Sequence, residues 1–307
     1  MKPPAFTYYA PTDLDEALHL LHELVHEQQR DVKLLAGGQS LVPLLNMRLA
    51  HPDAIIDLNP LEPQLSYVRR EGSTLQIGAL SRHYMLRDHP EIMRFCPVTA
   101  EAVRLIGHAA ILTRGTIGGS LVHADPAAEL PLVCALLGGS VTLRKASGSR
   151  NVPTPAFFVS YLTTSVEPDE ILTEVTLPTL PPRSGQAIEE FAQRHGDFAL
   201  AAAAAQITLN ADGTLANLRL CIGGAGPTPV DGSLIFASLA GRIVAPEDVR
   251  DALRGLDDEL DPLEDIHADA AYRKELARVM AFRAIERAWQ RARRARANEN
   301  QAVPDNS

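Results

Sequence analysis

The 307-residue sequence has few cysteines, few aromatic residues and no long apolar run. Its 3 cysteines, Cys96, Cys134 and Cys221, form no Cys-x-x-Cys pair, so the chain alone offers no thiolate set for an iron–sulfur cluster. An odd, scattered set is typical of reduced thiols and predicts a cytoplasmic protein. No apolar stretch of about 20 residues is present to span a membrane, and residues 1–6 lack the apolar segment of a signal peptide.

Positive charge is also scarce. Asp and Glu number 38 against 29 Lys and Arg, a formal net charge of −9, which argues against nonspecific nucleic-acid binding. The sequence shows no nucleophile–base pair, no metal-ligand cluster and no Walker pattern, so we expect neither catalytic side chains nor a metal site. An apolar fraction of 46% permits a sizeable core, and the length permits two domains.

The most informative stretch is a glycine turn at residues 33–41, Lys-Leu-Leu-Ala-Gly-Gly-Gln-Ser-Leu. A short apolar strand leads into Gly37 and Gly38, and a predicted helix starts at Leu41. Paired glycines adopt positive φ angles and expose backbone N–H groups. Such amides ahead of a helix form a site for a phosphate or pyrophosphate.

A second turn of this kind lies at residues 113–120, where Gly118-Gly119 is surrounded by hydroxyl residues. We expect the following helix to begin at Pro126, with Asp125 as its N-cap. Two separate glycine turns predict a ligand long enough to be held twice, such as a dinucleotide. The alternative is that both turns are purely structural.

Stretches rich in Pro, Gly and small polar residues mark the expected boundaries between domains. We predict a domain over residues 1–179, with subdomains 1–59 and 60–179, then a second domain over 180–292 and a disordered tail over 293–307. Strand and helix patterns within both domains indicate an α+β fold. The alanine-rich segment 199–209 has helix propensity, but the turn signal after it favours a β-hairpin.

Four motifs together resemble the FAD-binding medium subunit of molybdenum hydroxylases. They are residues 36–41 with 46–49, residues 116–131, residues 194–199 (Arg-His-Gly-Asp-Phe-Ala) and residues 223–229 (Gly-Gly-Ala-Gly-Pro-Thr-Pro). The resemblance runs from about Phe6 to about Trp289. The family includes the medium subunit of carbon monoxide dehydrogenase and the flavin domain of xanthine dehydrogenase.

The resemblance implies a fold and a role. The fold is a two-subdomain FAD-binding domain of the vanillyl-alcohol-oxidase type, followed by a small antiparallel sheet with helices. The role is that of a flavoprotein oxidoreductase subunit with FAD as cofactor. Its partners are a small [2Fe-2S] subunit, a large molybdopterin subunit and an external electron acceptor, in a dimer of heterotrimers.

The resemblance also implies the site residues. Both turns wrap the FAD pyrophosphate, which gives Leu34, Leu35, Ala36, Gly37, Gly38, Gln39, Ser40 and Leu41 from the first and Gly115, Thr116, Ile117, Gly118, Gly119 and Ser120 from the second. Asp125, Ala128, Glu129, Ile171, Leu172 and Arg194 complete the set.

Several of these residues have an ordinary alternative. Asp125 serves the cofactor or simply caps a helix, and Glu129 lies near the cofactor or faces solvent. Ile171 and Leu172 contact flavin or only fill the core, and Arg194 reaches a phosphate or holds Asp197.

The function has alternatives too. A stand-alone flavin oxidase is disfavoured by the 5% aromatic content and the missing acid–base pair. A non-catalytic assembly subunit is disfavoured by the intact glycines. The sequence leaves open the substrate and the electron acceptor.

Overall fold

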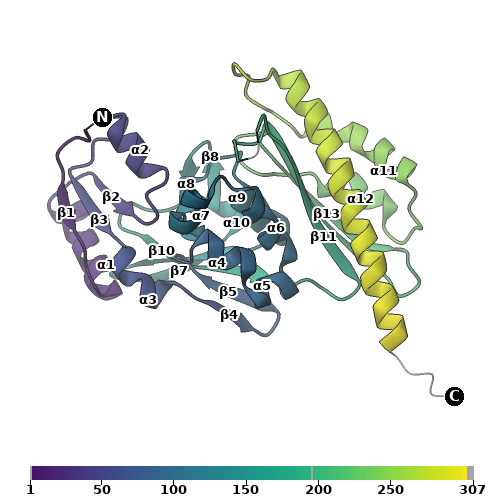
Figure 1. The fold of residues 1–307 in the computed structure, drawn as a ribbon, viewed down its shortest axis with the longest axis horizontal. Helices are drawn as coiled ribbons and strands as arrows, with labels where there is room; N and C mark the ends of the chain where they lie inside the picture. The colour runs from purple at the N-terminus through teal and green to yellow at the C-terminus, as the bar shows by residue number, and fades with distance from the viewer. Residues whose placement is uncertain (1, 195, 303–307) are drawn as a thin grey trace.

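The three larger sheets follow one another along the long axis of the molecule (Figure 1). The computed structural model describes residues 2–194 and 196–302. Within these residues, every helix is too short or too polar to cross a membrane. Strands and helices alternate irregularly, and two of the larger sheets are antiparallel, which confirms the predicted α+β class.

The N-terminal sheet is parallel, in the order β1-β3-β2. Its elements are β1 (Thr7–Tyr9), α1 (Leu14–His22), the π-helical turn η1 (Glu23–Glu27), β2 (Val32–Leu35), α2 (Leu41–Asn46) and β3 (Ala54–Asp57). Apolar residues at helical spacing in α1, among them Leu14, Leu18 and Leu21, are buried against the sheet. This packing fixes the end of β2, where the first glycine turn begins.

The central sheet is antiparallel, in the order β4-β5-β10-β6-β7. Its strands are β4 (Val68–Glu71), β5 (Thr74–Gly78), β6 (Ser140–Lys145), β7 (Gly148–Pro153) and β10 (Ile171–Pro178). The short helices of this region are η2 (Asn59–Leu61), α3 (Glu62–Leu65), α4 (His83–Asp88), α5 (Pro90–Phe95), α6 (Pro97–Leu105), α7 (Ala109–Arg114), α8 (Ile117–His123), α9 (Glu129–Leu137) and α10 (Thr154–Phe157), with a small ribbon of β8 (Phe158–Ser160) and β9 (Thr163–Thr164).

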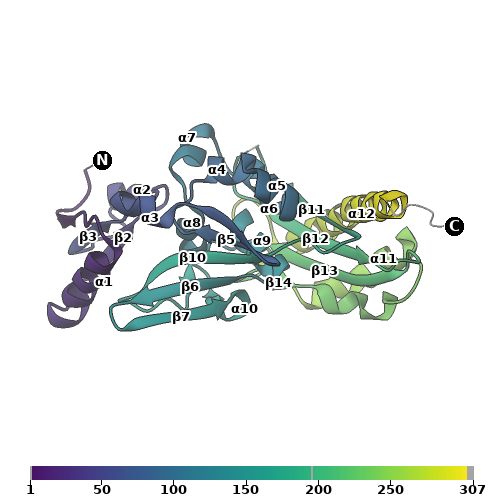
Figure 2. The same ribbon diagram turned by 90° about the horizontal axis from the view of Figure 1, so that it is seen from below.

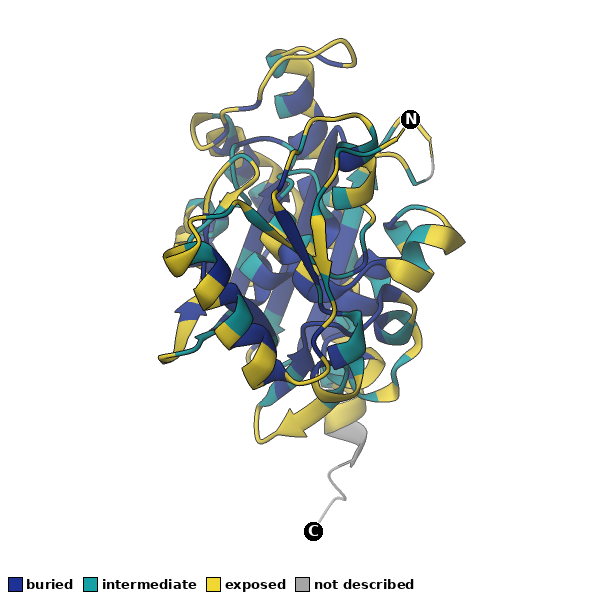
Figure 3. Cartoon of the chain, turned by 90° about the vertical axis from the view of Figure 1, so that its left-hand side faces the viewer, coloured by how far each residue is buried: buried dark blue, intermediate teal, exposed yellow. Residues whose placement is uncertain are grey.

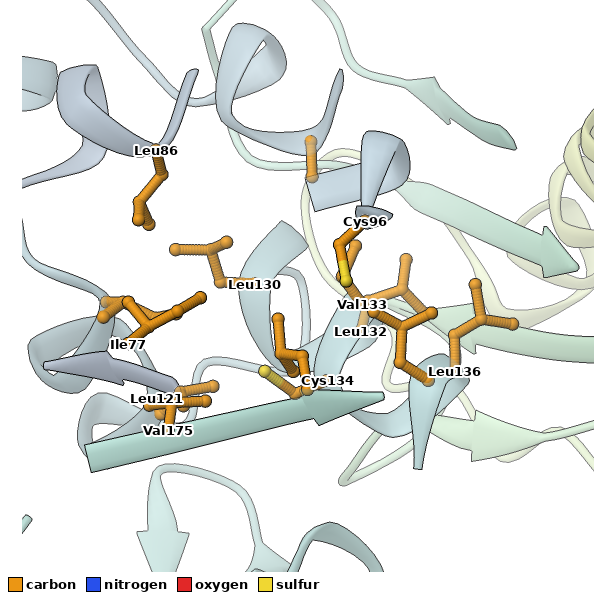
Figure 4. Close-up of a cluster of buried hydrophobic side chains, with 14 of the residues drawn as sticks. Ile77, Leu86, Cys96, Leu121, Leu130, Leu132, Val133, Cys134, Leu136 and Val175 are labelled. Atoms are coloured by element: carbon orange, nitrogen blue, oxygen red, sulfur yellow. The ribbon is translucent and has the colours of Figure 1, made fainter. Parts of the chain in front are cut away.

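Apolar side chains from these helices pack on one face of the central sheet. Figure 4 shows Leu121 of α8 near Val175 of β10, and Leu86 of α4 and Leu130 of α9 near Ile77 of β5. One face of α8 is therefore buried against the central sheet, and the opposite face forms part of the wall of a cleft.

The C-terminal sheet is antiparallel, in the order β11-β12-β13-β14. Its elements are β11 (Ser184–Phe191), β12 (Ala201–Leu209), β13 (Leu215–Gly223), β14 (Val230–Asp231), η3 (Ser233–Leu239), α11 (Pro246–Ala252), η4 (Leu253–Asp258) and α12 (Ala270–Ala302). The long helix α12 crosses one face of this sheet (Figures 1 and 2). Figure 3 shows buried strands in the interior and exposed faces on the outer helices.

The alanine-rich segment is the strand β12, as predicted, and it is buried on both faces. Ala202 and Ala204 join the core of the central sheet, whereas Ala201, Ala203 and Ala205 join the core under α12. Alternate residues of a strand point to opposite faces. Small side chains therefore let helices approach closely from both sides, which helix propensity alone would not indicate.

The predicted tail over 293–307 differs from the structure. Helix α12 continues to Ala302, ten residues past the predicted end at 292. Its extension is held by contacts with one end of the C-terminal sheet, since Arg296 Nε donates to Ala211 O at 3.0 Å in the turn after β12, and Arg183, just before β11, pairs with Glu299 at 2.9 Å. Residues 303–307 lie outside the described residues.

Candidate functional site

The first glycine turn has the form that the sequence predicts. β2 ends at Leu35, Gly38 has φ +73°, and α2 begins at Leu41. The backbone amides of residues 37–41 have no hydrogen-bond partner among the described residues. Because buried or half-buried amides normally find partners, this row of donors indicates a site for an anionic ligand.

The second glycine turn is built differently from the prediction. Gly118 and Gly119 lie inside α8, and Thr116 is its N-cap, accepting a hydrogen bond from the Gly119 amide at 3.1 Å. The amides of Ile117 and Gly118 donate to Ser81 O and Ala79 O. Exposed backbone amides are therefore a feature of the first turn, and the prediction of free glycine amides at the second turn is wrong.

The glycines of the second region serve close packing instead. A Cβ on Gly118 would lie 2.8 Å from atoms of Ala79, and one on Gly119 would lie 2.9 Å from Thr116 Oγ1. Larger residues would push α8 away from β5.

The helix after the second turn also begins later than predicted. Pro126 and Ala127 are not helical; α9 starts at Glu129, with Ala128 at the N-cap position. Asp125 instead accepts a hydrogen bond from the Ala127 amide at 2.9 Å. The Gly224 amide donates to Pro126 O at 2.8 Å, so the predicted motif at residues 223–229 holds this loop in place.

The two turns lie against each other. A Cβ on Gly37 would stand 2.3 Å from Arg114 O and 2.9 Å from Gly115 Cα. The buried Arg82 donates to Arg114 O, and Asn59 donates to Ala36 O at 2.9 Å. Neither Arg82 nor Asn59 belongs to a recognisable sequence motif, and the sequence analysis missed both.

Both turns open onto one cleft with a volume of about 560 Å³, within the range of small-molecule sites. Most of the predicted site residues line it: Leu34, Ala36, Gly37, Gly38, Gln39, Ser40, Leu41, Gly115, Thr116, Gly118, Gly119, Ser120, Asp125, Ala128, Glu129, Ile171 and Leu172. Leu35, Ile117 and Arg194 do not. Leu35 alternates with Leu34 along β2 and points away, and Ile117 is fully buried in the core.

Arg194 is exposed, and its link to Asp197 is a backbone hydrogen bond of 3.1 Å from the Asp197 amide to Arg194 O. The neighbouring Gly196, Asp197 and Phe198 line the cleft instead. His123 lines the cleft as well.

Glu129 does not face open solvent, since only 9% of the residue is exposed. Burial raises the pKa of its carboxyl group to about 8, and the nearby Glu190 and Asp125 carboxylates add to the shift. Burial also raises the pKa of Glu190 to about 7. The cleft therefore holds a carboxyl group that keeps its proton near neutral pH.

His83 also lines the cleft, and the sequence analysis did not single it out. Neither ring nitrogen has a hydrogen-bond partner among the described residues. Burial lowers the pKa of His83 to about 4. The nearby Thr116 backbone partly opposes this shift, although it lies outside hydrogen-bond geometry. A neutral imidazole with free nitrogens is available here to a bound ligand.

Two family models match consecutive parts of the chain. Residues 4–180 match the FAD binding domain in molybdopterin dehydrogenase, and residues 186–288 match the CO dehydrogenase flavoprotein C-terminal domain. The chain belongs to this family of flavoprotein subunits. The family confirms FAD as the cofactor and the oxidoreductase class, as the sequence predicted.

Relatives match this flavoprotein subunit over nearly its whole length. It is 39% identical to the 6-hydroxypseudooxynicotine dehydrogenase complex subunit alpha of Paenarthrobacter nicotinovorans, over 95% of this chain and 97% of that one. It is 33% identical to the carbon monoxide dehydrogenase medium chain of Hydrogenophaga pseudoflava, over 95% of this chain and 99% of that one. A solved structure of carbon monoxide dehydrogenase from that organism superposes with a TM-score of 0.89 at 34% identity, over 95% and 99% of the two chains.

The residues of the cleft fit FAD. Its pyrophosphate needs several backbone donors, which residues 37–41 offer, and its rings need an extended, largely apolar wall, which Leu34, Ile171 and Leu172 help to form.

Proposed function

We propose that this flavoprotein subunit carries electrons between [2Fe-2S] clusters of a small partner subunit and an external acceptor, in a complex whose large molybdopterin subunit hydroxylates the substrate. Its membership of the family, with matches spanning 95% of the chain, supports this role. Bound FAD supplies the exchange between one-electron donors and a two-electron acceptor. A dimer of heterotrimers is the assembly that the family resemblance implies.

The observation that carries the proposal is the row of amides at residues 37–41, which have no hydrogen-bond partner in the described part of the chain and lie on the wall of a cleft shared by both glycine turns. These amides bind the FAD pyrophosphate. The Thr116 hydroxyl oxygen accepts a hydrogen bond from Gly119, and the hydroxyl can also donate its hydrogen to a bound phosphate. Hydrogen bonds to charged groups contribute about 1.5–3 kcal/mol each, so a few of them account for tight binding.

The other side chains of the cleft hold and orient the cofactor. Ile171 and Leu172, at the start of β10, supply an apolar wall, and Ala128 leaves room where α9 begins. Glu129 and Asp125 face the same space as polar contacts. Leu35, Ile117 and Arg194 support this site from behind or from its edge and are not offered as contacts.

We also propose the division of the chain near residue 180, with an FAD domain over 1–179 and a second domain over 180–292. The family matches, 4–180 and 186–288, support this boundary. A cytoplasmic location is proposed as well, and three free, buried cysteines support it.

The test is to express the full chain alone and to measure its visible absorption after incubation with FAD. We expect a flavin spectrum, reduction by a reduced [2Fe-2S] partner subunit, and no turnover with candidate substrates when the chain is alone. A colourless protein would point to an assembly subunit, and turnover by the isolated chain would point to a self-contained oxidase.

A further inference from the structure

A second cluster of potential ligands lies outside the cleft, between α1 and the loop before β10. His22 ends α1, His26 lies in η1, and Asp169 precedes β10 by two residues. Oδ2 of Asp169 lies 3.6 Å from His22 Nδ1 and 3.1 Å from His26 Nε2. One ligand atom from each residue lies within 4.8 Å of the other two.

These separations suit a transition-metal ion. With bonds of about 2.0–2.2 Å, ligand atoms around a tetrahedral Zn²⁺ stand about 3.4 Å apart. The two histidines are four residues apart on one helical segment, the spacing by which helices hold zinc. Asp169 is fixed by burial, with 9% of its side chain exposed, whereas His22 and His26 are about half exposed. Solvent can therefore complete the coordination.

The surrounding charges leave this cluster available. Lys145 faces Asp169, but its ammonium group is paired with Glu167 at 2.7 Å. Glu170 is likewise paired with Arg150 at 2.7 Å. Asp169 has no such guanidinium or ammonium partner among the described residues and meets the two histidines instead.

We propose that His22, His26 and Asp169 bind one Zn²⁺ ion and thereby join α1 to the start of β10. The sequence reads His22-Glu23-Leu24-Val25-His26, a pattern that zinc hydrolases also contain. Here the Glu23 carboxylate accepts a hydrogen bond from Gln28 at 2.9 Å, so it is held away from a catalytic role. The site is a binding site that braces the two subdomains.

The proposed zinc site lies close in sequence to residues that line the cleft. Arg144 of β6 pairs with Asp15 of α1 at 3.2 Å, so α1 already lies beside the end of the central sheet (Figure 2). Ile171 and Leu172, which line the cleft, lie two and three residues after Asp169 along the chain. A bound ion would hold this end of β10 in place. The sequence analysis expected no metal site and did not single out these three residues, of which Asp169 is far from the histidines in sequence.

The test uses the full chain loaded with FAD and freed of metal by a chelator. Zn²⁺ is titrated by calorimetry, and Co²⁺ is added as a spectroscopic probe. We expect one equivalent of Zn²⁺, visible Co²⁺ bands of a low-coordinate site, and a rise in melting temperature, since a ligand that binds the folded state stabilises it.

Two variants and a control locate the site. His26→Gln and Asp169→Asn should each weaken binding by more than the ~10–100-fold that loss of an outer-shell partner costs. His19→Gln is the matched control, because His19 lies on the same helix and its Nδ1 contacts Asp15 O at 2.7 Å. It should bind as the wild type does. Absence of stoichiometric binding, or equal affinity in all three variants with unchanged circular dichroism and flavin content, overturns the proposal.

Discussion

Arg82 and Asn59 form a bridge between the two glycine turns. Arg82 Nη2 donates to Asn59 Oδ1 at 2.6 Å, and Arg82 Nη1 donates to Arg114 O at 2.5 Å beside the second turn. Asn59 Nδ2 in turn donates to Ala36 O at 2.9 Å in the first. The distance between the turns, and with it the width of the cleft, is thus set by two side chains outside the glycine motifs.

Replacing Arg82 should therefore weaken cofactor binding. Arg82→Met leaves Arg114 O and Asn59 Oδ1 without a partner, and each such loss costs about 1–3 kcal/mol. We expect the FAD dissociation constant to rise about tenfold or more, measured by flavin fluorescence in a titration of the flavin-free chain. Arg87→Met, which removes a surface pair with Asp88, is the control and should bind FAD normally. Equal affinity of the two variants would contradict the bridging role.

The contact between the turns offers a second test. Gly37→Ala would place a Cβ 2.3 Å from Arg114 O, which is backbone and cannot turn aside. The turns must then separate, and we expect a marked loss of bound flavin. The control is Gly255→Ala, whose new Cβ would meet its nearest neighbour, Ile235, at an ordinary 3.8 Å. The ratio of flavin to protein absorbance in the purified chains measures the effect, and full flavin content in Gly37→Ala would refute the explanation.

Local patterns predicted the first turn well because everything it needs is local. A strand, two glycines and a helix start follow one another between residues 32 and 46, and the structure has them there. The strand β12 was predictable for a similar reason, since the turn after it outweighed the helix propensity of its alanines.

The second turn was not predictable from local pattern. Glycine costs about 1 kcal/mol in a helix relative to alanine, so Gly118-Gly119 favours a loop by propensity. Tertiary hydrogen bonds from Ile117 and Gly118 to residues near β5 stabilise α8 instead. Arg82 and the burial of Glu129 were beyond sequence reasoning too, because the surroundings of both come from residues that are distant in the chain.

The two-sided burial of β12 predicts sensitivity to size. Ala203 is fully buried and faces the core beneath α12, so Ala203→Leu must displace that helix. Overpacking of this kind costs about 1–3 kcal/mol of unfolding free energy, which urea denaturation would detect. Ala216→Leu in β13 lies at an exposed position and should leave stability nearly unchanged. If both variants unfold at the same urea concentration, the packing of α12 is looser than the structure indicates.

The Glu129 carboxyl group predicts a pH dependence of stability. Its pKa is about 8 in the folded chain against an ordinary value of 4.5, so between these values the folded state binds more protons than the unfolded state. The stabilising contribution of the protonated form is complete below the lower value and is lost as pH rises toward the higher one. We expect the free energy of unfolding of the flavin-free chain to fall over this range.

Glu129→Gln removes one of the two carboxyl groups with a raised pKa and keeps the shape of the side chain, so it should make this pH dependence smaller. Urea midpoints at about pH 5.5 and about pH 8.5 provide the measurement. Glu247→Gln, at an exposed surface pair with Arg250, should keep the wild-type slope because its carboxyl group is solvated in both states. Glu190 has a raised pKa of about 7 itself and also raises the pKa of Glu129, so Glu190→Gln should likewise make the fall in stability between these two pH values smaller. A wild-type slope in Glu129→Gln would show that Glu129 does not contribute to this pH dependence.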